Sequence, residues 1–151
     1  MSLVEAAIRG GAVTVLLLVA TLLLRDRRHI PTRRYSALFA LSVAAYVIAS
    51  APGFFALDAR WRMPIAVASM GTPAVFWLAA VAHFDDDFKP SLYRHLAWLG
   101  LVLVGLWQVL AEQPIAYFLY HGLAFGFIVF AVWRAFVGRD TDLLEDAGNF
   151  V

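Results

Sequence analysis

The residues of this sequence best suited to chemistry are two phenylalanines that enclose three consecutive aspartates: Phe84, Asp85, Asp86, Asp87 and Phe88. Carboxylates this close together can bind a cation, and the flanking His83 and His95 add imidazole nitrogens, so a metal site is one interpretation. The spacing matches no established zinc pattern, however. We therefore expect no metal and no other cofactor, and we favour an acidic turn that is kept in water.

His121 is the second candidate, because it is the only imidazole well inside an apolar stretch. Such a histidine can serve as a proton site or as a ligand contact. A histidine hydrogen-bonded to a neighbouring helix, or one near a membrane interface, is the interpretation that we favour. The chain has no cysteine, and neither a Ser/His/Asp arrangement nor a phosphate-binding glycine loop is recognisable. We expect no enzymatic activity.

The composition indicates what surrounds these residues. Of the 151 residues, 62% are hydrophobic and only 15% are charged. A soluble domain usually has about 25% charged residues. This chain has more apolar surface than one soluble core can bury, so lipid is expected to be the solvent for most of it.

Five apolar stretches are long enough to cross a bilayer, which takes roughly 20 residues per helix: 6–24, 35–55, 63–84, 92–111 and 114–137. Lipid offers no partner to open backbone groups. The sequence thus predicts an all-α fold, a polytopic transmembrane bundle of about five helices in one integral-membrane domain over residues 1–151. The first stretch is followed directly by "RDRRHIPTRR", without a small-residue cleavage site, so we expect a retained helix rather than a signal peptide.

The orientation follows from lysines and arginines, which are enriched on the cytoplasmic side. If the five stretches alternate in direction, one side receives nine cations: Arg25, Arg27, Arg28, Arg33, Arg34, Lys89, Arg94, Arg134 and Arg139. The other side receives three: Arg9, Arg60 and Arg62. The N-terminus is therefore expected outside and the C-terminus in the cytoplasm. The aspartates then share the cytoplasmic side with the first five arginines, which are candidate ion-pair partners.

Two features concern helix packing. Gly122 and Gly126 are four residues apart on one face of the last stretch, where another helix, from the same chain or from a second copy, can approach closely. Pro73 lies in the middle of the third stretch and is expected to kink it. The segment "SMGTP", residues 69–73, is the expected site of irregularity, and its hydroxyl groups can bond the carbonyls that the kink frees.

Residues 76–107, "FWLAAVAHFDDDFKPSLYRHLAWLGLVLVGLW", resemble the N-terminal membrane domain of membrane-bound AraC-type transcriptional regulators, in which a helix ending in "FDDDF" precedes a basic, aromatic turn and another hydrophobic helix. Residues 121–146 are similar to the following helix of that family, which ends in a "DLVE"-like stretch. The resemblance spans about residues 35–145 and is most specific at residues 84–88. It implies a membrane domain that senses a signal and is joined to a cytoplasmic helix-turn-helix domain.

The chain departs from that pattern after the acidic stretch. Family members continue with an arginine-rich run, further membrane helices and the DNA-binding domain, whereas this chain ends in "DAGNFV". It has no basic recognition helix, so we expect no direct nucleic-acid binding. It is interpreted as a truncated relative, a fragment or a stand-alone module.

The preferred interpretation is a sensor or anchor module in the bacterial inner (cytoplasmic) membrane, with lipid as its partner and a homo-oligomer left open. The alternatives are a small structural or assembly membrane protein without a signalling role, and a transporter component. The apolar centres of the stretches, which lack Asp, Glu, Lys and Arg, count against the transporter.

Overall fold

The computed structural model describes residues 2–25, 30–85, 88–111 and 113–148, with side chains described as far as Val137. These residues form helices and no strand: α1 (Leu3–Arg25), α2 (Pro31–Ala49), a short 3-10 helix (Phe54–Ala56), α3 (Ala59–Met70), α4 (Thr72–Phe84), α5 (Leu92–Ala111) and α6 (Pro114–Gly148). The expected all-helical bundle is confirmed for this part of the chain.

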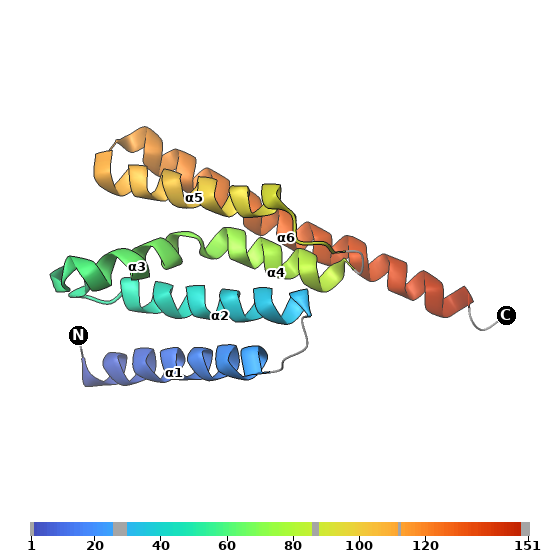
Figure 1. Cartoon of the computed structure of the whole chain (residues 1–151), viewed down its shortest axis with the longest axis horizontal. Coiled ribbons are helices and arrows are strands. Elements are labelled where there is room, and N and C mark those ends of the chain that lie inside the picture. The colour runs from blue at the N-terminus through green and yellow to red at the C-terminus, as the bar shows by residue number, and fades with distance from the viewer. Residues whose placement is uncertain (1, 26–29, 86–87, 112, 149–151) are drawn as a thin grey trace.

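The helices run back and forth and lie side by side in the order α1, α2, α3 with α4, and then α5 with α6 (Figure 1). The end of α1, the start of α2, the end of α4, the start of α5 and the point where α6 leaves the bundle are gathered at one end, on the right in Figure 1. We call this the exit end and define it by the described residues 25, 30–34, 84–85, 88–95 and 134. Cationic residues of the exit end in the described ranges are Arg25, Arg33, Arg34, Lys89, Arg94 and Arg134.

Three helices are long and apolar enough to cross a membrane: α1, α5 and the Pro114–Val137 part of α6. The helices α3 and α4, bent by 47° at the break between them, would together make a fourth span. The α2 helix is less apolar, because it begins with "PTRRYS" and is rich in alanine. It also ends at Ala49 rather than at residue 55, since the "SAPGF" segment turns the chain at Gly53, whose φ is 91°.

The surface of α1 is what a helix in lipid requires. Ala20 is its one buried residue among those described, and large apolar side chains such as Val15, Leu18 and Leu22 are more than half exposed. On the inner side, Ala20 meets Ala37 and Ala40 of α2. Small residues let the two backbones approach closely, which is the usual way for helices to pack in a membrane.

The chain bends at Gly71, inside the segment where irregularity is expected. Pro73 does not lie in mid-helix, as the sequence predicts, but in the first turn of α4, where its missing N–H is harmless. The Thr72 hydroxyl donates to the Ser69 carbonyl (2.8 Å) and lies 3.2 Å from the Ser42 carbonyl of α2. The expectation that hydroxyl groups bond the freed carbonyls is thereby confirmed.

Residues of α5 and α6 also contact the break closely. A Cβ on Gly71 would collide with the indole nitrogen of Trp98 on α5, and a Cβ on Gly105 would lie 3.0 Å from Sδ of Met70. The hydroxyl of Tyr120 on α6 donates to the Met70 carbonyl at 3.0 Å. The bend therefore holds α5 and α6 against α3 and α4.

Candidate functional site

The acidic turn begins where α4 ends. Asp85 leaves the helix with an extended backbone (φ −128°, ψ 100°), and the Phe88 N–H donates to its carbonyl at 3.0 Å. The two phenylalanines of the motif differ sharply, because Phe84 is 43% exposed and Phe88 only 8%. Asp86 and Asp87 lie outside the described residues.

The Asp85 carboxylate joins three helices. Its Oδ2 lies 3.2 Å from a guanidinium nitrogen of Arg134 on α6 and 4.0 Å from one of Arg94 on α5. The three side chains are between 15% and 31% exposed. Because water screens them only in part, these ion pairs are stronger than a pair on the open surface.

Arg94 connects this carboxylate to the apolar core. Its guanidinium carbon lies 4.5 Å from the centroid of the Phe88 ring, and it donates to the Lys89 carbonyl at 3.1 Å. A guanidinium over an aromatic face is stabilised by the ring quadrupole. The cation thus lies against the face of the buried Phe88 ring.

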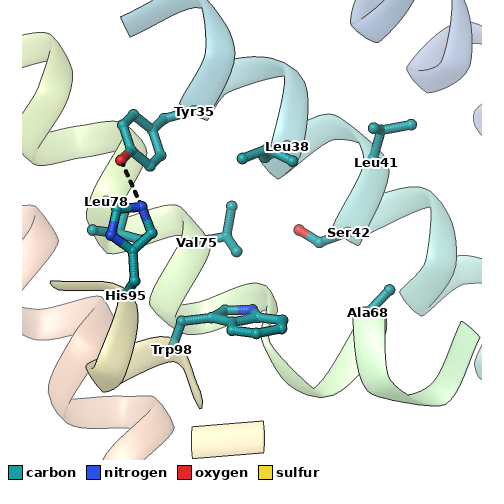
Figure 2. A pocket seen from close by; sticks show the side chains of 9 residues that line it. All are labelled: Tyr35, Leu38, Leu41, Ser42, Ala68, Val75, Leu78, His95 and Trp98. Atoms are coloured by element: carbon teal, nitrogen blue, oxygen red, sulfur yellow. Dashed lines mark hydrogen bonds between the residues drawn. The ribbon is translucent and has the colours of Figure 1, made fainter. Parts of the chain in front are cut away.

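Beneath Phe88 lies Tyr35 of α2. The two rings meet edge to face with centroids 5.3 Å apart, and both pack against Leu78 and Val81 of α4. The Tyr35 hydroxyl is 3.1 Å from Nε2 of His95, as the dashed line in Figure 2 shows. His95 Nδ1 is 2.8 Å from the Ser91 carbonyl, which can only accept, so Nδ1 carries a proton.

A second bond ties α2 to the end of α4. The Thr32 hydroxyl donates to the Ala82 carbonyl at 2.7 Å. This carbonyl lies in the last turn of α4, where helix carbonyls lack an intrahelical partner. The first turn of α2 therefore caps the helix that carries the acidic turn.

The arginine-rich connection is only partly described, since Arg27 and Arg28 lie outside the described residues. Arg25 is the last residue of α1, and Arg33 and Arg34 in the first turn of α2 each make a polar or ring interaction. Asp85 pairs with Arg94 and Arg134. Neither arginine was among the candidate ion-pair partners from the sequence. The sequence did place Arg94 and Arg134 on the same side of the membrane as the aspartates, but it did not indicate which acid each arginine would meet.

Two adjoining cavities open beside this cluster. The larger, about 420 Å³, lies between α2, the α3–α4 break and α5, and Figure 2 shows Leu38, Val75 and Trp98 around it. The smaller, about 390 Å³, lies toward the exit end and is lined by Arg34 and Pro90, among others. Tyr35, Leu38 and His95 line both cavities.

Comparison with protein-family models, with curated proteins and with solved structures finds no match.

The histidines do not converge on the aspartate. His83 stacks edge to face on Phe84 (5.0 Å), and His121 is exposed, bonded to the Tyr117 carbonyl of its own helix at 2.8 Å. Among the described residues, no group of three His, Asp or Glu side chains is placed to hold a metal ion. His121 is thus held by its own helix rather than by a neighbouring one.

The glycine pair on α6 faces away from the bundle. Gly122 and Gly126 are exposed, and a Cβ on either would meet nothing within 4 Å. Among the described glycines, the close approaches occur instead at Gly71, which belongs to the irregular segment 69–73, and at Gly105, which the sequence did not single out. The α6 pair is therefore open to lipid or to a second copy.

Proposed function

We propose that this chain is a sensor or anchor module of the bacterial inner membrane, similar to the membrane domain of AraC-type regulators. It works through a signal-dependent change in helix packing that reaches the cytoplasm along α6. The observation that carries this proposal is the Asp85–Arg134 ion pair, which joins the acidic turn to α6 where α6 leaves the bundle. Since α6 continues without a break to Gly148, a displacement at Arg134 moves its projecting part as well.

The α4 helix provides the route from the bundle interior to that ion pair. The Trp77 ring lies 5.4 Å from the Phe127 ring of α6, and α4 begins at the bend beside Trp98. A change of the bend angle shifts the other end of α4, and with it Asp85. Two rigid helices that meet at a defined break are a common basis for such a movement.

The proposed topology counts α2 as a membrane span and has five in all. The 19 residues of α2 rise about 28 Å at 1.5 Å per residue, nearly the thickness of the hydrocarbon core. Its lower hydropathy suits its place between α1 and α4, where lipid does not surround it (Figure 1). The cations gathered at the exit end favour that end as the cytoplasmic one.

The topology can be tested with single cysteines, because the chain has none of its own. We expect Ser2→Cys and Leu57→Cys to react with a membrane-impermeant maleimide on intact spheroplasts. Lys89→Cys should react only after lysis, and a cytoplasmic reporter fused to the C-terminus should be active. Labelling of Lys89→Cys from outside would reverse the orientation, and protection of Leu57→Cys would show that α2 does not cross.

The coupling role of Asp85 gives a second prediction. Asp85→Asn removes the charge that both arginines contact, so we expect a loss of about 1–3 kcal/mol in the free energy of unfolding in mixed micelles. Hydrogen exchange should accelerate in α6 beyond Arg134. Asp58→Asn is the matched control, because Asp58 pairs with Arg60 through side chains that are 60% and 75% exposed, and it should cost less than about 1 kcal/mol. Unchanged exchange in α6 after Asp85→Asn would refute the coupling.

The open glycine pair supports a second candidate, a structural membrane protein that assembles through α6. In that case Gly122→Leu/Gly126→Leu should turn a dimer into a monomer in mild detergent, since leucine side chains keep two backbones apart. Gly10→Leu/Gly11→Leu is the control, because these glycines also have nothing within 4 Å. An unchanged oligomeric state, measured by light scattering, would leave this candidate without support.

A further inference from the structure

The two cavities beside Tyr35 differ in chemical character. Apolar side chains dominate the larger one, including Leu41, Val75 and Leu78. Its one hydroxyl other than that of Tyr35 belongs to Ser42 and donates to the Phe39 carbonyl of its own helix at 2.9 Å. The larger cavity is therefore suited to a hydrocarbon chain and not to a polar molecule.

The smaller cavity is the more polar of the two, although Leu38 and two prolines also line it. Arg34 brings a permanent positive charge to the wall of this cavity. The cavity lies at the exit end, beside the first turn of α2, where the backbone N–H groups of the helix point out of its N-terminus. Pro31 and Pro90 form part of the same wall. Such a site favours an anion.

Tyr35 and His95, which line both cavities, are hydrogen-bonded to each other. The hydroxyl and the imidazole are the polar groups that both cavities share. A ligand that fills both cavities must accordingly carry an anionic group at one end and a hydrocarbon chain at the other. That is the chemistry of a membrane lipid with a negatively charged head group.

We propose that these cavities bind one anionic phospholipid from the leaflet at the exit end. One acyl chain occupies the cavity between α2, the α3–α4 break and α5. The phosphate lies beside Arg34, close to Tyr35 and His95. Charge favours a phospholipid over a second copy of the chain as the occupant. The exit end is cationic, so it attracts an anionic head group and repels the exit end of a second copy. The inference needs the membrane location proposed above, but neither the orientation nor the signalling role.

The test is native mass spectrometry of the full chain in mild detergent, titrated with phosphatidylglycerol or with phosphatidylcholine of the same acyl chains. We expect one bound lipid and a preference of about fivefold for phosphatidylglycerol, because one cation near an anionic head group has about that effect. Arg34→Gln should remove most of the preference. Leu38→Trp, a larger side chain in the wall that both cavities share, should weaken the binding of both lipids.

Two controls carry the same substitutions elsewhere. Arg62→Gln removes an arginine from the α2–α3 side, and Leu22→Trp enlarges an exposed α1 residue that lines neither cavity. Both should bind lipid as the unchanged chain does.

Equal affinity for the two phospholipids, or a preference that survives Arg34→Gln, would overturn the proposal. Binding of oleate without phosphatidylglycerol would assign the site to a free fatty acid, and a dimer that excludes lipid would assign it to a second copy. The maleimide topology result does not enter this test, so the two proposals can fail separately.

Discussion

Phe88→Ala is expected to lower the free energy of unfolding in mixed micelles by about 3–5 kcal/mol, the usual range for removing a buried phenylalanine. The ring is 8% exposed and packs against Tyr35 and the residues of α4 beneath it. Its loss also leaves the Arg94 guanidinium without the face on which it lies. The acidic turn should then detach from the bundle, and limited proteolysis should cut within residues 84–91.

The matched control comes from the same five-residue motif. Phe84→Ala removes the same ring from a position that is 43% exposed, so we expect it to cost less than about 1 kcal/mol. Both changes delete the same atoms, so a difference between them reports what surrounds each ring: its burial and, for Phe88, its contact with Arg94. Equal effects of the two substitutions would contradict the insertion of Phe88 into the bundle.

Gly71→Ala is expected to lower the free energy of unfolding by about 1–3 kcal/mol through overpacking. The backbone of Gly71 has φ −78°, which any residue can adopt, so the glycine is required for space and not for conformation. The added Cβ would fall on the Trp98 indole, whose Cδ1 would be 2.8 Å away. Trp98 must move, and a change in tryptophan fluorescence should accompany the loss of stability.

Gly100→Ala serves as its control, because a Cβ there would meet nothing within 4 Å. Alanine is the better helix former, so this change should be neutral or slightly stabilising. A double-mutant cycle gives the decisive measurement, since Gly71→Ala should cost much less in a Trp98→Phe background if the indole is the obstacle. A cost that does not depend on residue 98 would mean that another contact is responsible.

Both predictions concern points where helices far apart in the sequence are held together. Phe88 joins the acidic turn to α2, and Gly71 lets α5 approach the bend between α3 and α4. If the bend angle changes in a signalling movement, Gly71 lies at its start and Asp85 at its end. The free energies of unfolding of the Phe88 and Gly71 variants therefore report on the two ends of the proposed movement.

Much of the fold could be predicted because it depends on local and compositional properties. Residues 92–111 coincide with α5, and 6–24 lies within α1, since long apolar runs in lipid have no alternative to a helix. The irregular segment at residues 69–73 was also predictable from a local property, because proline has no N–H to donate to the preceding turn of a helix. The predicted position of Pro73 in mid-helix was wrong, because α3 ends before Gly71 and α4 begins after it. Nothing in the sequence indicated that the helix would end there.

The site could be predicted less well. The motif at residues 84–88 stood out by composition, but nothing in it distinguishes the buried Phe88 from the exposed Phe84. The glycine pair on α6 followed a known packing pattern and yet faces outward, while Gly71 and Gly105 follow no pattern and make the close contacts. Such contacts depend on which side of a helix meets its neighbour, and a helix that is apolar all round carries no signal for that.

The sequence by itself determined that this protein is helical, that lipid suits most of its surface and that its cations are unevenly distributed between the ends of its helices. Each of these properties is a sum over neighbouring residues. Only the tertiary structure decided that Asp85 meets Arg94 and Arg134, that Tyr35 lies between Phe88 and His95, and that two cavities adjoin there. These contacts join segments that are distant in the chain, and their free energy comes from packing and charge in three dimensions, which no local pattern records.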